Sequence, residues 1–441
     1  MFKKEPVIKM SLLSRIFFYS LIFLGYLFFM SIYAPLGISW LDYHAERMTN
    51  AVNFLNLNGF ETFGFTVWSS CGDCILEGLE ENAMYSSLNG ISLFPYILLN
   101  YFGGIESLLF FGPMIDKLFI FIGAVLIAEL MIKFIQDYSS LPDYLIGMAC
   151  FSLFALSPWT YKMFLDGWWE GLFLMCFLFG MVAFQNKRFK LGYLVFFLAG
   201  VFHHLWALVI SIFYILLIIS SYLLPGERKF NKYFPPNIVS PNMNMKLIFA
   251  LALSSIIFFL SQFLASQYFV FGSGSSVFFR MGISGNDIYN GGLIGALQFL
   301  GGSRFTQCFQ GMGMEAFSGS TMVIIAMYNC LFSIAGMGII SLIAIFGAYL
   351  LIKNSTLAMQ TLIPLIFALL FFIGVFQQSM SVHLMGYSYI FSAIFSVGIT
   401  YLMLVLQKSS GSNLLGFIFS IPCLAGILIL SIRVSMLSGM S

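Results

Sequence analysis

The chain has 441 residues, of which 60% are apolar and only 9% are charged, and its mean hydropathy is +0.94. Soluble domains carry roughly 25% charged residues, so this composition excludes soluble folds, disordered chains, collagens and disulfide scaffolds. The net charge of +2 is too small to indicate nucleic-acid binding. Apolar runs recur along the whole chain, and about 20 apolar residues cross a hydrocarbon core of about 30 Å. The sequence therefore predicts an all-α polytopic membrane protein, because helices satisfy their own backbone groups in lipid.

The apolar runs predict about eleven transmembrane helices. These spans lie near 14–35, 114–135, 143–158, 168–185, 191–202, 204–224, 247–265, 326–352, 357–376, 384–406 and 414–435. The first run is longer than the apolar core of a signal peptide, so we interpret it as a retained span. The stretch 191–224 is too long for one helix and too short for two full ones, and we predict two helices that turn at His203-His204. The stretch 91–101 is too short to span and is predicted to lie at the membrane surface.

Charge supports this layout. The segments predicted to face the cytoplasm hold 14 Lys and Arg and 4 Asp and Glu, whereas the rest of the chain holds 6 and 14. These segments are the N-terminus, 133–143, 185–190, 225–246 and the turns at Lys353 and Lys408. Short cytoplasmic loops of membrane proteins carry an excess of Lys and Arg. The rule also requires the break at His203-His204, because one span there would place the basic loop 225–246 outside.

We therefore predict a single integral membrane domain over 1–441, with the N-terminus in the cytoplasm and the C-terminus outside. Two long loops, 36–113 and 266–325, lie on the outer face in this layout and are expected to carry juxtamembrane helices. The loop 225–246 is interpreted as a solvated basic loop on the cytoplasmic face.

A first acidic cluster follows the first span directly. The stretch Ser39 to Gly59 has the apolar spacing of an amphipathic helix, and Asp42 and Glu46 are four residues apart on one face of it. A carboxylate at the outer mouth of a membrane cavity can accept a proton from an acceptor hydroxyl or hold a divalent cation. The alternative is that Asp42 only caps the helix together with Ser39.

A second acidic cluster lies in the outer turn 157–173, where Asp166 and Glu170 are again four residues apart. The tryptophans of this turn are typical of an interfacial aromatic belt. Their rings also suit stacking on a sugar or an isoprenoid chain, so both interpretations stay open.

Cationic and imidazole side chains form a third, scattered set at the outer boundary. They are Lys117, His203, His204, Arg280, Arg304 and His383. Such groups bind a phosphate or pyrophosphate if they converge, although Lys117 has Asp116 beside it as a simple pairing partner. Glu129, in the middle of a span, is expected to face a neighbouring helix or Lys133 rather than a substrate.

The chain shows no nucleotide-binding or zinc motif. Cys71 and Cys74 have no second pair at ligand spacing, so we expect a local disulfide or two free thiols. A P-loop, a GxGxxG after a strand, an HExxH and a GxSxG are all missing from the sequence. An activated donor for a transferase would therefore arrive through the membrane.

Several segments of the first half share the pattern of one family. They are D-Y-H-A-E-R-M-T-N-A-V-N-F-L-N-L-N-G after the first span, Y-S-S-L-N-G-I-S-L-F-P-Y-I-L-L-N-Y-F-G before the second, D-K-L-F-I-F-I-G-A-V-L-I-A-E-L-M-I-K-F in the second, and S-P-W-T-Y-K-M-F-L-D-G-W-W-E-G-L-F at the third-to-fourth turn. With the helix pair at His203-His204, they resemble the GT-C superfamily of polytopic glycosyltransferases, which use polyprenyl-phosphate-linked sugars. The second half matches only in span count and loop placement.

The resemblance implies an inverting hexosyl or pentosyl transfer to a lipid, glycan or protein acceptor on the outer face of a bacterial inner membrane. Asp42 would be the catalytic carboxylate, assisted by Glu46 and by Asp166 or Glu170. The leaving phosphate would be neutralised by cations drawn from Lys117, His203, His204, Arg280, Arg304 and His383.

This sequence departs from the commoner family pattern in two places. The first acid is followed by Tyr43-His44 rather than a second acid, and His203-His204 stand where an arginine is usual. A divalent cation, Mg²⁺ or Mn²⁺ held by Asp42 and Asp166, is therefore only one option, and His protonation offers a way to modulate donor binding near neutral pH.

Two other functions fit the same layout. A transporter or lipid flippase would line a substrate path with the outer charges, but such folds often repeat a broken span in both halves, and the break at His203-His204 has no obvious counterpart. An O-antigen ligase or polymerase would rely on Arg280, Arg304 and His383 instead of Asp42.

Overall fold

A computed structural model describes residues 10–33, 42–58, 65–67, 84–135, 142–155, 157, 160, 170–223, 232–238, 240–269, 340–375 and 380–410. Its helices are α1 (Leu12–Tyr33), α2 (Asp42–Asn58), α3 (Phe94–Phe134), α4 (Asp143–Ala155), α6 (Glu170–Gln185), α7 (Phe189–Phe202), α8 (His204–Leu223), α9 (Pro241–Phe269), α14 (Ile340–Asn354), α15 (Thr356–Val375) and α16 (Met380–Ser410). Strands β1 (Phe65–Val67) and β2 (Met84–Asn89) pair antiparallel with an irregular register after Phe65.

The helix positions agree with the sequence-based spans wherever these fall in the described residues. The predicted amphipathic helix after the first span is α2, and the break at His203-His204 is confirmed, because α7 ends at Phe202 and α8 begins at His204. The all-α prediction holds apart from the short β ribbon in the first long loop, which the sequence analysis did not predict. The span near 414–435, the first part of 326–352 and the loop 270–325 lie outside the described residues.

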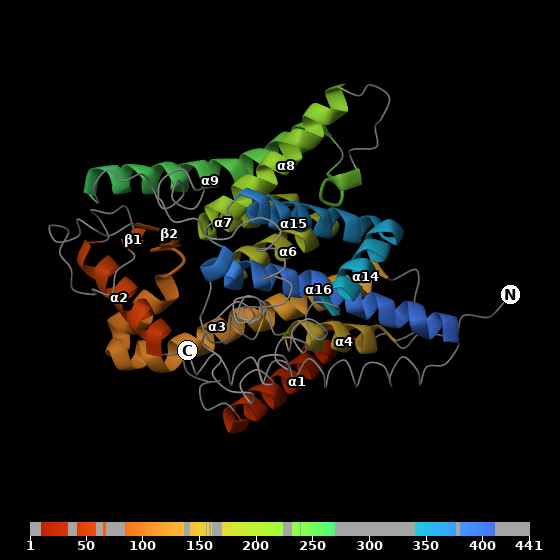
Figure 1. The fold of residues 1–441 in the computed structure, drawn as a ribbon, viewed down its shortest axis with the longest axis horizontal. Helices are drawn as coiled ribbons and strands as arrows, with labels where there is room; N and C mark the ends of the chain where they lie inside the picture. The colour runs from red at the N-terminus through yellow and green to blue at the C-terminus, as the bar shows by residue number, and fades with distance from the viewer. Residues whose placement is uncertain are drawn as a thin grey trace, which may run out of the picture.

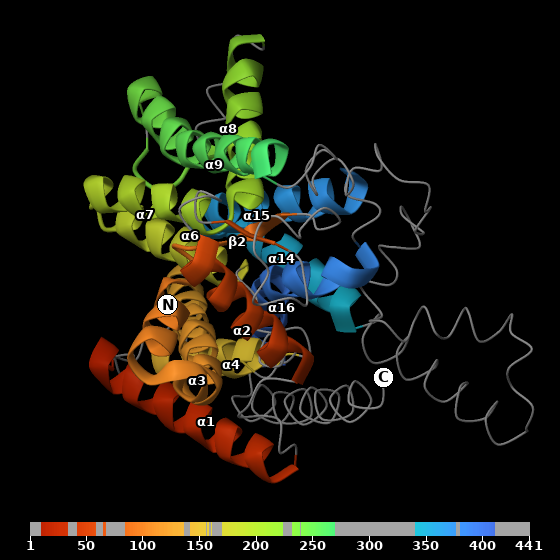
Figure 2. The same ribbon diagram turned by 90° about the vertical axis from the view of Figure 1, so that its left-hand side faces the viewer.

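The helices form a bundle with α1 along one side and α8 and α9 along the opposite side (Figure 1). Between them lie α3, α4, α6 and α16 (Figure 2). Helix α2 and the ribbon gather at one end of the bundle, on the left in Figure 1 and toward the viewer in Figure 2. Helix α2 contacts α3 and β1, and β2 contacts α9, so the described parts of the first long loop lie at this end.

Within the described ranges, one helical segment, Tyr389–Ser409 of α16, is both long and apolar enough to cross a membrane. Shorter apolar helices of 10–17 residues accompany it.

Large apolar side chains also cover much of the outside of the bundle. On α1, Phe17, Leu21, Leu24 and Phe28 recur at helical spacing on the exposed face, and Phe28 is 69% exposed, while Tyr19 and Phe23 of the opposite face are buried. Other outward-facing apolar residues are Leu118, Leu194, Leu216, Ile219, Phe249, Ile256, Leu342 and Phe346. Large exposed apolar surfaces mark sites of contact with other proteins or with a membrane.

Charge divides the bundle into two ends. The start of α1, the end of α3 and the α6–α7 and α14–α15 turns lie at the same end of the bundle. We name it the basic end. Among the described residues, this end has nine Lys and Arg and two acids, Glu129 and Asp143, whereas the opposite, acidic end has two bases and five acids. The nine are Arg15, Lys133, Lys187, Arg188, Lys190, Lys232, Lys246, Lys353 and Lys408. The acidic end carries Arg47, Lys117, Asp42, Glu46, Glu106, Asp116 and Glu170.

Small and hydroxylated side chains allow close helix packing in the core. Ser157, two residues after the end of α4, donates a hydrogen bond of 2.8 Å from its hydroxyl to that of Ser392 of α16. Helices α14 and α16 pack backbone to backbone, because a Cβ built on Gly398 would meet the carbonyl oxygen of Ala344 and one on Gly347 would meet that of Gly398. Small residues at such crossings are typical of helix pairs in membranes.

We expect Gly398→Ala to lower the free energy of unfolding by about 1–3 kcal/mol, the usual cost of overpacking. The added methyl group would clash with backbone atoms of α14, which cannot move away by a change of rotamer as a side chain can. Gly25→Ala on α1 is the matched control, because a Cβ there meets nothing within 4 Å. Thermal unfolding in detergent should leave Gly25→Ala unchanged or slightly stabilised, and an equal loss in both variants would contradict the close crossing.

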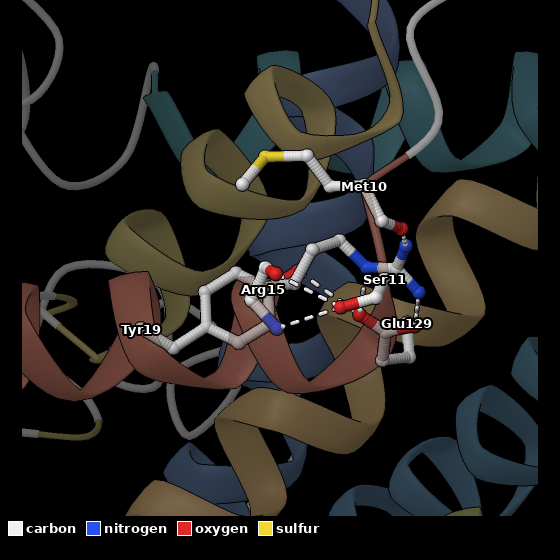
Figure 3. A network of polar contacts seen from close by, with 6 residues as sticks. Met10, Ser11, Arg15, Tyr19 and Glu129 are labelled. Carbon is white, nitrogen blue, oxygen red and sulfur yellow. Dashed lines mark hydrogen bonds and ion pairs between the residues drawn. The ribbon is translucent and has the colours of Figure 1, made fainter.

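An ion pair joins α1 to α3 near the basic end (Figure 3). Arg15 donates from Nε to Glu129 Oε1 at 2.8 Å and from Nη2 to Oε2 at 2.6 Å, and the Tyr19 hydroxyl donates to Oε1 at 3.1 Å. The remaining Nη1 donates to the Met10 carbonyl at 2.6 Å. The prediction that Glu129 faces a neighbouring helix is confirmed, and Glu129 is accordingly a structural residue.

Candidate functional site

Helix α2 packs against the first part of α3 at the acidic end. Its residues Met48, Ala51, Val52 and Leu55 are buried together with Leu93, Tyr96 and Leu108 in a small apolar cluster separate from the main core. The spacing of the α2 residues places them on one face of the helix. This packing fixes α2, which carries Asp42 and Glu46, beside α3.

Helix α3 contains a kink that folds its first part back along its second. Gly104 has φ 70° and ψ −172°, a conformation that L side chains rarely adopt, and it separates Phe94–Gly103 from the part that continues to Phe134. Glycine adopts such angles without steric cost. The first part contains the stretch 91–101 that the sequence predicted to be a surface segment, and the second part contains the predicted span 114–135.

The kink brings together a buried polar group, which we name the Tyr96 cluster: Tyr96, Asp116 and Lys117. The Tyr96 hydroxyl donates a hydrogen bond to Asp116 Oδ1 across 20 residues of sequence. Tyr96 is 1%, Asp116 7% and Lys117 4% exposed, and the Asp116 charge acts electrostatically on the neighbouring ammonium. Buried charges are costly unless paired or hydrogen-bonded, and here Asp116 accepts from the Tyr96 hydroxyl and has the Lys117 charge beside it.

Burial, followed by the Asp116 charge and the hydrogen bond to it, raises the pKa of Tyr96 well above its usual value. The phenol therefore stays protonated and remains a donor at every physiological pH. The Asp116 carboxylate is thereby stabilised partly by a neutral hydrogen-bond donor, the Tyr96 hydroxyl, and not by Lys117 alone.

His203 lies at the α7–α8 turn, also at the acidic end. It is 4% exposed, and its ring lies edge-on to Trp206 at 6.5 Å between centroids, while Trp206 packs on Phe173 of α6. Its backbone N–H donates to the Ala199 carbonyl at 3.0 Å, which ends α7. The imidazole of this turn residue is thus buried beside the Trp206 ring.

The structure describes the positions of some of the other predicted site residues but not of all of them. Asp42 begins α2 and Glu46 follows one turn later, Glu170 begins α6, His204 begins α8, and His383 lies in the first turn of α16. These positions are all at the acidic end of their helices. Asp166, Arg280 and Arg304 lie outside the described residues, as do Ser39, Cys71 and Cys74.

Sequence reasoning missed Tyr96. It identified Lys117 and Asp116 as neighbours in sequence, but the third member of the cluster lies beyond a chain reversal. The available signal was the pair Gly103-Gly104 inside an otherwise continuous apolar helix, because glycine there indicates a break or a close approach.

The described residues provide no obvious metal site. Among them, no group of three His, Cys, Asp or Glu side chains lies close enough to hold an ion. The described residues contain instead a buried ammonium, that of Lys117, and a buried carboxylate held by a phenol, beside the helix α2 that begins at Asp42.

Comparison of the chain with protein-family models, curated proteins and solved structures finds no match.

Proposed function

We propose that the protein is a polytopic membrane protein with its basic end in the cytoplasm and its acidic end outside. Two features support this. The outside of the bundle carries exposed Phe, Leu and Ile side chains on several helices, and the cationic residues of the described chain collect at one end. Both follow from a bilayer, whose hydrocarbon favours apolar surface and whose cytoplasmic side favours Lys and Arg.

Within that bundle, the chain is proposed to be a glycosyltransferase that moves a sugar from a polyprenyl-phosphate donor to a lipid, glycan or protein acceptor outside the membrane. The observation that carries this proposal is the buried Tyr96 cluster directly beside α2. It supplies a cation for a phosphate next to a helix whose first turn supplies a base. Buried ionisable groups near a membrane interface are most often functional.

The proposed step is one displacement at the anomeric carbon. Asp42 accepts the proton of the acceptor hydroxyl as its oxygen forms a bond to that carbon. The bond from the carbon to the donor's phosphate oxygen breaks, and its electron pair leaves with the polyprenyl phosphate. Lys117 attracts the departing phosphate, and Tyr96 holds Asp116 so that the carboxylate does not fully neutralise Lys117. Attack opposite the leaving group inverts the configuration.

The supporting groups have narrower roles in this proposal. Glu46 is proposed to assist Asp42, and either Asp166 or Glu170, the residue that begins α6, is proposed as a further acidic helper. His203, His204, Arg280, Arg304 and His383 are proposed to assist Lys117 with the phosphate. The proposed step does not depend on Mg²⁺ or Mn²⁺, for which Asp42 and Asp166 are the candidate ligands.

A donor panel tests the proposed reaction. Purified protein in detergent is incubated with polyprenyl-phosphate hexoses and pentoses and with candidate acceptors, and the appearance of free polyprenyl phosphate is followed by mass spectrometry. We expect turnover of at least one lipid-linked donor and none of nucleotide sugars. Transport of an intact lipid-linked sugar across vesicles without cleavage would contradict the transferase and support the flippase alternative.

A further inference from the structure

A groove lies on the surface of the bundle between α7 and α9, away from the Tyr96 cluster. It encloses about 570 Å³ and is lined by Leu194, Phe197, Phe249, Ala250, Leu253 and Lys246. Residues 246 to 253 span about 10 Å at 1.5 Å per residue. The groove is thus an apolar channel with a cation at the end nearer the cytoplasm.

The groove is built into the fold at its basic end. The Tyr193 hydroxyl of α7 donates to the Met243 carbonyl of α9 at 3.3 Å, which sets the separation of the two helices there. Leu194 and Phe249 are 55% and 63% exposed, so the walls face outward rather than into the core.

Positive charge surrounds the basic end of this groove. Lys190 is exposed one helical turn before Leu194, on the same face of α7, and Lys187 and Arg188 are exposed in the preceding turn. From Gly171 to Phe269, the described residues contain no Asp or Glu to offset these charges. Apolar walls below a cluster of cations complement a molecule with an acyl chain and an anionic headgroup.

We propose that this groove binds an anionic phospholipid of the cytoplasmic leaflet, with its phosphate between Lys190 and Lys246 and one acyl chain along Leu194, Phe197 and Phe249. The inference rests on the proposed membrane insertion, but it does not depend on the sugar-transfer chemistry. It assigns to α7 and α9 a lipid site at the opposite end of the bundle from the candidate active site.

Lipid retention tests the site. The full-length protein is purified in detergent, equilibrated with equal amounts of phosphatidylglycerol and phosphatidylcholine, and examined by native mass spectrometry. We expect preferential retention of phosphatidylglycerol. The double variant Lys190→Gln/Lys246→Gln should reduce its apparent affinity by roughly 25-fold, about five-fold for each lysine. Lys353→Gln/Lys408→Gln is the matched control, because it removes two cations of the same end on other helices.

Several outcomes would overturn the inference. They are equal retention of the two lipids, an unchanged preference in the groove variant, or an equal loss in the control. A dimer in the same spectra that Phe249→Ala dissociates would show that a second copy fills the groove. A protein that stays soluble without detergent would overturn the membrane proposal as well. Normal sugar transfer by the lysine variants is expected, so a failure here would leave the transferase proposal intact.

Discussion

Asp42→Asn is expected to lower the rate of sugar transfer by about 10²- to 10⁴-fold, the contribution of a general base. Asparagine keeps the size of the side chain but cannot take up the proton of the acceptor hydroxyl. Asp42 begins α2, and the apolar face of that helix, which is packed on α3, is untouched by the substitution. Membrane abundance should therefore remain at the wild-type level. Release of polyprenyl phosphate by the purified variant measures the effect.

The controls separate a base from a helix cap and from a different active site. Asp143→Asn makes the same change at the start of α4 on the basic end and should leave the rate unchanged. If Asp42 only caps α2, Asp42→Asn will retain activity, because asparagine is an equally good cap. Loss of activity in Arg280→Ala together with normal activity in Asp42→Asn would favour the ligase or polymerase alternative.

Arg15→Met is expected to lower the free energy of unfolding by about 3 kcal/mol, the lower end of the cost of breaking a buried ion pair. The substitution removes the guanidinium from the Glu129 carboxylate, which keeps the hydrogen bond from the Tyr19 hydroxyl and the electrostatic attraction of Lys133. The side chains of Arg15 and Glu129 are 13% and 15% exposed, so limited solvent access keeps the cost below that of a fully buried pair. Unfolding in detergent with increasing dodecyl sulfate measures the difference.

The double variant Arg15→Met/Glu129→Met gives the sharper result. Well-packed apolar residues often replace a buried ion pair at little cost, so the double variant should be more stable than Arg15→Met alone. Equal or greater destabilisation of the double variant would mean that the pair stabilises the bundle beyond neutralising its own charges.

The helices were predictable because their signal is local. An apolar run of a given length indicates a helix whatever surrounds it, and this was sufficient for α1, α4, α6 and α15. The break at His203-His204 also had one non-local argument, the distribution of basic residues between the two sides of a membrane. The structure has the same break, which the length of the apolar stretch 191–224 predicted and the charge distribution supported.

For the tertiary contacts, the sequence indicated the kind of interaction but not the residues that make it. The sequence indicated that Glu129 needs a partner, but not that Arg15 on α1 supplies it. The Tyr96–Asp116 contact depends on the positive φ of Gly104, and no periodicity in the sequence specifies a chain reversal. The β1–β2 ribbon was missed because its strands of 3 and 6 residues are shorter than a pattern can establish.

The Arg15–Glu129 pair has a consequence for the order in which the chain is assembled. Glu129 follows Arg15 by 114 residues, so at roughly 5–20 residues per second the ribosome needs on the order of ten seconds to deliver the carboxylate after the guanidinium. In the proposed insertion into a bilayer, the nascent α1 would carry Arg15 before Glu129 is made, and its guanidinium could meanwhile extend toward lipid phosphates. Under that proposal, keeping α1 close to the emerging α3 would bring the two partners together, which links their pairing to the timing of translation.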